Sequence, residues 1–214
     1  IMQIAYDITK AYGLKDADFE IRLNNRKVMN YVTRDIFGLS EEHAQKVSKL
    51  IDKKDKISAD IFADGIKEIL GDDAPKFLTL LNSKNFEEFA KQLPQTKEEH
   101  EGLKEIKEAI ASLENLGITN VRFDQTLMRG FDYYTGTVFE VFDKNPANRR
   151  SVFGGGRYDD LMSEFGEDKI PFVGFGAGDV VAQDLMETYG VNVEQGASAD
   201  IGICIIGDQN TAFA

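Results

Sequence analysis

The order of hydrophobic and polar residues predicts alternating helix and strand at the start of the chain. Apolar side chains recur at helical spacing over residues 1–12, and Gly13 is placed to end that helix. Apolar and charged residues then alternate over 19–23, which is the period of a half-buried strand. Helical spacing returns over 28–36 and stops at Gly38.

The next segment is different because its pattern is helical throughout. Ser40 and Ser58 precede helical stretches and are expected to cap their first turns, whereas Gly71 and Gly117 are expected to end helices. No strand period occurs in this segment. We therefore expect residues 1–38 to begin an α/β framework that a helical insertion, residues 39–117, interrupts.

Strand patterns return over 118–123 and 137–142, in a second part of the framework that we expect to span 118–195. The polar stretch 143–150 joins the second run to 151–153, so an antiparallel hairpin with a long loop is predicted. The three glycines that follow, at 154–156, are expected to interrupt the returning strand.

Further elements are predicted after the hairpin. Residues 158–165 have the pattern of a short helix, 171–177 that of an apolar strand, and 179–189 that of an amphipathic helix. The apolar run 201–206 is typical of a buried strand. Only residues 207–214 follow it, so we expect a truncated domain to begin within 196–214.

Composition and charge narrow the class of protein. The chain has 214 residues, 42% of them hydrophobic, which is ordinary for a globular protein. Its net charge of -12 argues against a general nucleic-acid coat, but not against a shaped nucleic acid touched by a local basic patch. Its one cysteine, Cys204, excludes a disulfide framework within the chain. No apolar run approaches the roughly 20 residues that cross a bilayer, so we expect a cytoplasmic protein.

The segment 129–140 and the glycines that follow carry the most specific chemistry. Arg129 is a permanent cation whose planar donors suit carboxylate or phosphate, and two adjacent tyrosines, Tyr133 and Tyr134, follow it. If that segment is extended, the two tyrosines point to opposite faces. The glycines at 154–156 would let a ligand approach the backbone closely. These residues predict a site for a small anionic molecule, although a surface ion pair of Arg129 is the alternative.

Other candidate residues can be explained by structural or solvent-exposed roles as well as by a function. Gly174 to Gly178 lacks the third glycine of a dinucleotide fingerprint. His43 and His100 lie in polar helical segments, so solvated histidines are favoured and we predict no metal site. The cluster that contains Lys53, Lys54 and Lys56 is either a solvated face or a patch that contacts phosphate.

The motif sequences resemble one known family. Leu127-Met-Arg-Gly-Phe-Asp-Tyr-Tyr-Thr-Gly-Thr-Val-Phe-Glu140 is similar to the histidine-binding motif of histidyl-tRNA synthetases. Gly154-Gly-Gly-Arg-Tyr-Asp159 is similar to the glycine-rich motif that follows it in that family. Phe19-Glu-Ile-Arg-Leu-Asn-Asn-Arg26 and Ile51-Asp-Lys-Lys-Asp-Lys-Ile57 resemble the same family in order and spacing, so the likeness covers nearly the whole chain.

The resemblance implies a fold and an activity. The fold would be α+β, a class II synthetase-type sheet, mainly antiparallel, with flanking helices and a helical insertion near the tRNA acceptor arm. The activity would be ATP-dependent formation of histidyl-adenylate, with Mg²⁺ accompanying ATP, and transfer of histidine to tRNA(His) by a homodimer. A fragment that lacks the upstream ATP-binding motifs is expected to be inactive.

The same resemblance implies roles for individual residues. Arg129 would bridge the histidine carboxylate and the α-phosphate, and would be the catalytic residue. The histidine-binding residues would be Tyr133, Tyr134, Gly155, Gly156 and Tyr158. Lys53, Lys54 and Lys56 would be candidates for tRNA contact.

One departure from the family pattern keeps other functions open. The arginine usual in the third motif would fall at Val181, so the family's clamp on the ATP purine is absent there. This favours a non-catalytic paralogue, the histidine-binding regulatory subunit of ATP phosphoribosyltransferase. The long helical insertion and the Asp132-Tyr133-Tyr134 sequence favour the synthetase. A stable module without activity is the third possibility.

Overall fold

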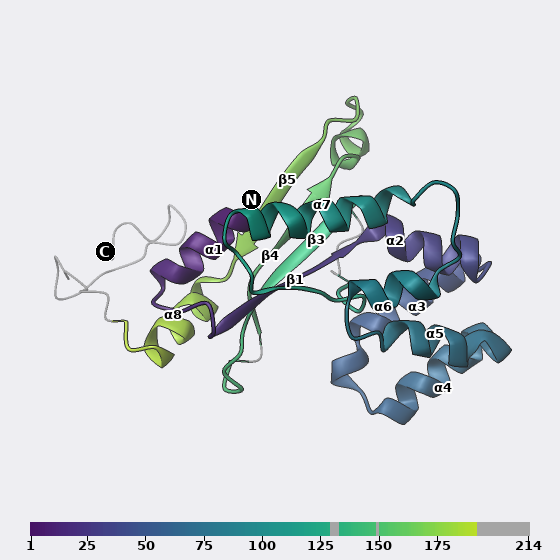
Figure 1. The fold of residues 1–214 in the computed structure, drawn as a ribbon, viewed down its shortest axis with the longest axis horizontal. Coiled ribbons are helices and arrows are strands. Elements are labelled where there is room, and N and C mark those ends of the chain that lie inside the picture. Colours follow the sequence, from purple (N-terminus) through teal and green to yellow (C-terminus); the bar gives the residue numbers. More distant parts are fainter. Residues whose placement is uncertain (129–132, 149, 192–214) are drawn as a thin grey trace, which may run out of the picture.

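A five-stranded mixed sheet is the centre of the protein (Figure 1). The computed structural model describes residues 1–128, 133–148 and 150–191. Within them the strand order is β2-β1-β3-β4-β5, with β1 and β2 parallel and the other pairs antiparallel. The strands are β1 (Phe19–Asn25), β2 (Val121–Phe123), β3 (Thr137–Asp143), β4 (Ser151–Tyr158) and β5 (Phe172–Ala177). The predicted α+β class, with a mainly antiparallel sheet and flanking helices, is confirmed.

Helices precede, interrupt and follow the sheet in the chain. The α-helices are α1 (Met2–Ala11), α2 (Arg26–Asn30), α3 (Glu41–Asp52), α4 (Ala59–Leu70), α5 (Ala74–Leu81), α6 (Phe86–Gln92), α7 (Glu101–Asn115) and α8 (Asp179–Thr188). A π-helix (Tyr31–Ile36) continues α2, and short 3-10 helices lie at Lys54–Lys56, Gly71–Asp73 and Leu161–Phe165. The last of these replaces the longer helix predicted over 158–165.

Local sequence signals account for the ends of the helices. The side chains of Ser40 and Ser58 accept hydrogen bonds of 3.3 Å from backbone amides in the first turns of α3 and α4, as predicted. Gly71 and Gly117 have φ angles of 56° and 80°, a region in which a side chain would be strained. The predicted helix starts and stops are therefore confirmed at these positions.

The helix α7 lies apart from the other helices of the predicted insertion. Helices α3 to α6 gather beside the sheet, whereas α7 packs against α2, β1 and β3 (Figure 1). It approaches α2 closely, because a Cβ added at Gly102 would lie 2.8 Å from the Val28 side chain. Glu105 of α7 accepts a 2.6 Å hydrogen bond from the Asn25 side chain. The division of the chain at 38, 117 and 195 stays a prediction, and residues 192–214 lie outside the described part.

One face of the sheet is packed by helices and forms the core. Alternate residues of the strands point to it, and five of the largest are at most 1% exposed: Phe19, Ile21, Leu23, Phe139 and Phe153. Rings of α1 contact this face, since Tyr6 lies 5.5 Å from Phe19 and Tyr12 stacks 6.1 Å from Phe153. Leu185 of α8 belongs to the same cluster. The strand period therefore assigns the intervening residues to the opposite face.

The prediction that glycines interrupt strand β4 was wrong. The glycines at 154–156 do not interrupt it, because their backbones pair with Glu140 to Val138 on one side and with Gly176 to Gly174 on the other. Glycine lacks a side chain but keeps both hydrogen-bonding groups, so a ladder can run through it. The irregularity in the hairpin lies instead between Val141 and Phe142 of β3. Strand β1 likewise continues through Asn24 and Asn25, beyond the range 19–23 that the alternation predicted.

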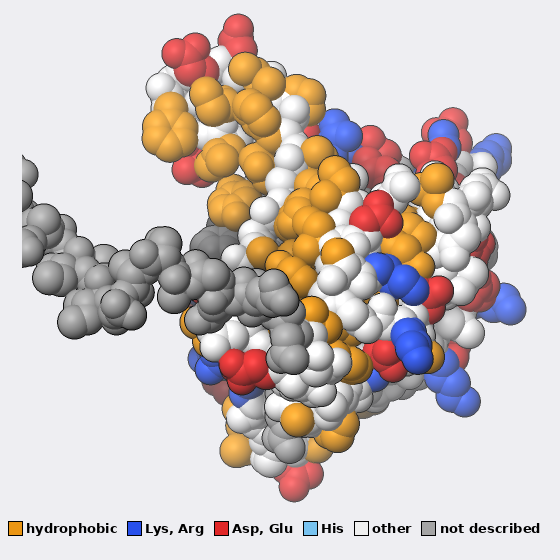
Figure 2. All heavy atoms as spheres, turned by 90° about the vertical axis from the view of Figure 1, so that its left-hand side faces the viewer, with side chains coloured by type: hydrophobic (Ala, Val, Ile, Leu, Met, Phe, Trp, Pro, Cys, Tyr) orange, Lys and Arg blue, Asp and Glu red, His pale blue; other side chains and the backbone are white. Residues whose placement is uncertain are grey.

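Apolar side chains are exposed near β5, which pairs only with β4 among the described strands. Phe165 is 74% exposed and Val173 59% exposed, and Ile170 and Phe172 are also exposed. Hydrophobic side chains gather at the upper end of the view in Figure 2, where β5 and the Leu161–Phe165 helix lie. The apolar strand predicted over 171–177 is thus an edge strand with an exposed surface.

Candidate functional site

Three tyrosines form a cluster on the face of the sheet opposite the core. The ring of Tyr133 lies 4.6 Å from that of Tyr134 and 5.4 Å from that of Tyr158. Their packing is tilted or edge-to-face, and the Tyr133 and Tyr134 hydroxyls are 3.5 Å apart. Leu127 and Val138 complete the cluster. The cluster thus has apolar ring surfaces and several hydroxyl groups.

The placement of the two adjacent tyrosines differs from the prediction. Opposite faces were expected, but both rings belong to one cluster. Residues 133 and 134 precede β3 in a turn, so the two-residue period of a strand does not apply to them. Both side chains are therefore available to the same site.

Glycines of β4 and β5 form the floor beneath the tyrosine rings. A Cβ at Gly156 would lie 2.8 Å from a ring carbon of Tyr134, and one at Gly174 would lie 2.4 Å from the Tyr158 hydroxyl. Gly156 and Gly174 are paired neighbours in the sheet. Gly155 points to the other face, where a Cβ would lie 2.5 Å from Cβ of Phe175. Gly156 and Gly174 are therefore required by the rings above them, and Gly155 by packing between strands.

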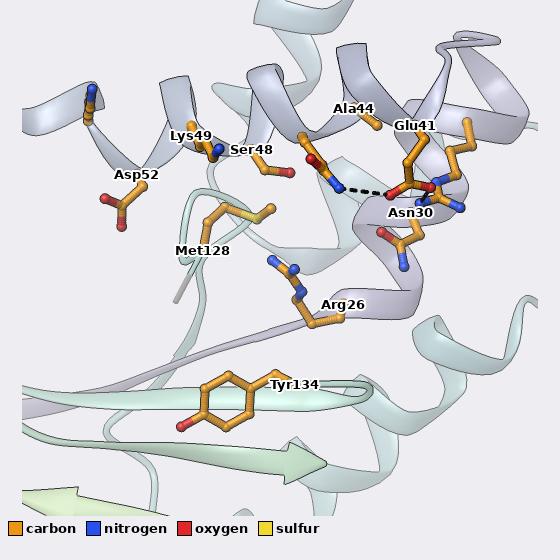
Figure 3. Close-up of a pocket in the computed structure, with 12 residues that line it drawn as sticks. Arg26, Asn30, Glu41, Ala44, Ser48, Lys49, Asp52, Met128 and Tyr134 are labelled. Atoms are coloured by element: carbon orange, nitrogen blue, oxygen red, sulfur yellow. Dashed lines mark hydrogen bonds and ion pairs between the residues drawn. The ribbon is translucent and has the colours of Figure 1, made fainter. Parts of the chain in front are cut away.

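A cavity of about 580 Å³ opens between this cluster and α3. Arg26 extends into it from the end of β1, Met128 from the segment before the tyrosines, and Tyr134 from below (Figure 3). Lys49 and other residues of α3 form the opposite wall, together with Lys53 at the C-cap of that helix. A cavity of this size suits a small molecule or part of a larger ligand.

Charges of both signs line the cavity. Arg34 and Glu41 form an ion pair, and Gln45 donates a 3.3 Å hydrogen bond to Glu41 (Figure 3). Of the predicted lysines, Lys53 lines the cavity, Lys56 pairs with Asp52 at 3.4 Å, and Lys54 lies in the short helix between them. The basic cluster is thus partly neutralised, and Lys53 is its member at the cavity.

A second charged group joins α7 to the start of α2. Lys27 forms ion pairs with Glu105 at 2.6 Å and Glu101 at 2.9 Å. Burial lowers the pKa of Lys27, but hydrogen bonds to the two carboxylates outweigh it and leave the pKa raised. Lys27 therefore stays charged at neutral pH.

The structure brings together some of the predicted site residues and adds others. Tyr133, Tyr134, Tyr158 and Gly156 meet in one place, whereas Arg129 lies outside the described residues. Arg26 and Met128 were not predicted as site residues, because only the fold brings their segments to α3, whereas Lys49 belongs to the basic cluster that the sequence indicated. His100 caps α7 by accepting from the Gly102 amide at 3.2 Å, and it stacks on Tyr31. No cluster of three or more metal-binding side chains occurs in the described part of the chain.

Comparison with known sequences decides the family. Residues 1–178 match the family model for histidyl-tRNA synthetase. The chain belongs to the histidyl-tRNA synthetase family. The histidine–tRNA ligase of Leptospira biflexa is 32% identical over 220 residues, covering 99% of this chain and 48% of that protein. That of Haloarcula marismortui is 31% identical over 218 residues, covering 100% of this chain and 50% of that protein. The chain spans about half the length of the curated relatives it matches.

Solved structures of this family share the fold. The histidyl-tRNA synthetase of Nostoc sp. PCC 7120 superposes with a TM-score of 0.76 at 25% identity, over 89% of this chain and 46% of that one. A Bacillus halodurans protein, described as an ATP phosphoribosyltransferase regulatory subunit/histidyl-tRNA synthetase, gives 0.72 at 25% identity, over 86% and 48%. The predicted class II synthetase fold is thereby confirmed. No helix among the described residues is long and apolar enough to cross a membrane.

Proposed function

We propose that this chain is the histidine-binding part of a histidyl-tRNA synthetase. The complete gene product would activate histidine with ATP and transfer it to tRNA(His). The observation that carries this proposal is the tyrosine cluster over Gly156 and Gly174, in a chain whose curated relatives are histidine–tRNA ligases. Such a cluster offers flat rings for packing an imidazole and hydroxyl groups that can hydrogen-bond its nitrogens.

The proposed mechanism depends on positioning and charge. Tyr134, with Tyr133 and Tyr158, would shape the histidine pocket, and Gly156 would leave room for the Tyr134 ring that bounds it. Gly155, which the family resemblance also implies as a binding residue, points to the packed face and is left out of the proposed pocket. Arg129 would neutralise the charge that develops as the histidine carboxylate attacks the α-phosphate. Reactions of this kind gain most from preorganised electrostatics and orientation, so no protein nucleophile is invoked.

The described residues supply little of an ATP site. They contain no group of three or more His, Cys, Asp or Glu side chains that could hold a metal ion, and Val181, where the resemblance implies an arginine, packs against the core. We therefore derive no step through Mg²⁺ and assign no described residue to ATP. In this proposal ATP and its Mg²⁺ bind the complete gene product, which acts as a homodimer in the cytoplasm.

The decisive experiment is histidine-dependent exchange of pyrophosphate into ATP, measured on the complete gene product. Exchange at typical synthetase rates, absent without histidine, is the expected result. Histidine binding without exchange would refute the activity while leaving the pocket intact. Failure to bind histidine would refute the pocket as well.

A second function is favoured by one observation. Val181 stands where the family has an arginine, and the Bacillus halodurans structure is described as a regulatory subunit as well as a synthetase. The alternative is therefore a histidine-binding regulatory subunit of ATP phosphoribosyltransferase. It predicts histidine binding without exchange, together with a stable complex with that enzyme.

Contact with tRNA is proposed for Lys53, Lys54 and Lys56. Lys53 lines the cavity beside Tyr134, which places a positive charge next to the candidate site. Reversal of Lys53 and Lys54 to glutamate should weaken tRNA binding most at low salt, because phosphate contacts release counterions. The matched control reverses Lys67 and Lys84, two exposed lysines that do not line the cavity, so that both variants change the net charge equally. Equal losses of tRNA affinity in both variants would show that the effect comes from net charge and not from contact at Lys53 and Lys54.

A further inference from the structure

The turn of residues 124–127 lies between the sheet, the insertion helices and the tyrosine site. The turn is closed by a 3.0 Å bond from the Leu127 amide to the Asp124 carbonyl, and Asp124 also accepts from Thr126. The Asp124 amide donates to Leu23 of β1 at 2.9 Å. Met128, the next residue along the chain, lines the cavity with Tyr134. The position of this turn therefore sets where the segment leading to the tyrosines begins.

Gln125 joins the turn to the insertion helices. Its side-chain amide donates to the carbonyl oxygens of Leu81 at 2.5 Å and Ser83 at 2.8 Å, at the end of α5. Gln125 is only 5% exposed, so both bonds are shielded from water. Two residues earlier, Phe123 packs its ring between Phe86 and Phe89 of α6. Apolar packing thus holds α6 against the β2 edge of the sheet, and the two hydrogen bonds of the Gln125 amide fix the position of the end of α5 relative to the turn.

Asn24 joins the same turn to the sheet. Its amide nitrogen donates to the carbonyl oxygens of Gln125 and Leu127 at 3.3 and 3.2 Å. Asn24 is 1% exposed, and its amide oxygen has no hydrogen-bond partner among the described residues. An unpaired buried oxygen is unfavourable, so stability alone does not explain an asparagine here. The amide nitrogen of Asn24 is the group that binds the turn.

We propose that Gln125 and Asn24 are positioning residues for the tyrosine site, which hold the 124–127 turn between α5 and β1. Through this turn the placement of the insertion helices is transmitted to Met128 and Tyr134. A change in the insertion, such as contact with a large ligand, would then alter the candidate site without touching it. This role deepens the proposed function, and its effect on histidine affinity rests on that function.

The test compares Gln125→Met with Gln92→Met in the complete gene product. Methionine keeps the length of the side chain and removes the donors. Gln92 is the control for the end of α5, because the side-chain amide of this exposed residue donates to the Ser83 hydroxyl at 2.7 Å but does not touch the turn. Backbone hydrogen exchange of residues 126–128, 133 and 134 and histidine affinity are measured in both variants, together with the thermal midpoint.

Gln125→Met is expected to speed exchange of residues 126–128, 133 and 134 about tenfold and to raise the Kd for histidine by a similar factor, because it removes two buried hydrogen bonds. Gln92→Met is expected to do neither. Equal effects in the two variants, or none in Gln125→Met, would overturn the proposal. If Gln125→Met does not fold, Asn24→Leu decides in the same way, because it loosens the turn and leaves the α5 contacts in place. If Gln125→Met speeds hydrogen exchange but the unaltered protein does not bind histidine, Gln125 still positions the turn, and the proposal that the site binds histidine is refuted.

Discussion

The two faces of the sheet are built from the same strands but from different kinds of residue. The packed face carries large apolar side chains such as Phe139 and Phe153, which the helices α1, α7 and α8 cover. The opposite face carries glycines, with tyrosines above them and charged side chains beside them. Successive residues of one strand thus contribute alternately to the packed core and to the candidate site.

This contrast explains two of the three consecutive glycines of β4. Gly156 and Gly155 point to opposite faces, and each meets a different obstacle, the Tyr134 ring on one side and the Phe175 backbone on the other. Packing of the strands and access to the rings therefore both require small residues in the same segment. Substitutions on the two faces should accordingly affect different properties.

The largest effect is expected on the packed face. Phe153→Ala should lower the free energy of unfolding by about 3–5 kcal/mol, because Phe153 is 1% exposed and its loss leaves a cavity. Phe165→Ala is the control, since that side chain is 74% exposed. Denaturant titration of both variants checks this prediction. A comparable loss for Phe165→Ala would contradict the division between buried core and exposed apolar surface.

A change on the opposite face should act mainly on the site. A methyl group at Gly156 would lie 2.7 Å from the Thr137 carbonyl oxygen and 2.8 Å from the Tyr134 ring, so both the β3 backbone and the ring must move. Misplacement of a binding group by about 1 Å can reduce activity by about 10²-fold, and we expect a loss of that order in histidine-dependent exchange.

The control for this substitution is Gly176→Ala, on the same face, where no described atom lies within 4 Å of the added methyl group. Gly176→Ala should leave the thermal midpoint unchanged. If Gly156→Ala retained full exchange, the Tyr134 ring would not belong to the site.

The smallest effect concerns the pH dependence of stability at the edge of the packed face. Burial raises the pKa of Tyr189, and its 2.7 Å hydrogen bond to Asp143 raises it further. The folded state therefore keeps this proton when the unfolded chain has lost it, so its stabilising contribution is complete below about pH 10 and falls as the pH rises above that value.

Tyr189→Phe should make the unfolding free energy less dependent on pH between about pH 9 and 11. Urea titrations at these two pH values measure how steeply the unfolding free energy changes with pH. An unchanged slope would show that Tyr189 ionises alike in the folded and unfolded chain. Tyr12→Phe provides the comparison on α1, where a tyrosine stacks on Phe153.

Much of the fold could be predicted because its signals are local. The serines at 40 and 58 and the glycines at 71 and 117 mark helix ends through bonds and backbone angles within a few residues. The alternation in β1 and β3 likewise predicted two faces before any partner strand was known. The tyrosine and glycine motifs predicted the family, which the comparisons confirmed.

Other features depended on contacts between distant segments. The glycines of β4 could be strand or break, and pairing with β3 and β5 decided for strand. Helix α7 has the same helical pattern as its neighbours, yet Gly102 and Glu105 dock it on α2 and β1. Gln125 appears unremarkable in the sequence, and only the carbonyl groups of α5 give its amide a role.

The sequence by itself determined the periods of the helices and strands, most of their ends, and the residue types of the candidate site. Those properties follow from backbone conformation and hydrogen bonds over a few neighbouring residues. The tertiary structure alone decided that Tyr133 and Tyr134 share one cluster, that Gly156 lies beneath it, and that Arg26 and α3 enclose the cavity beside it. Each of these needs two or more segments in contact, and a pattern along the chain does not specify which segments will meet.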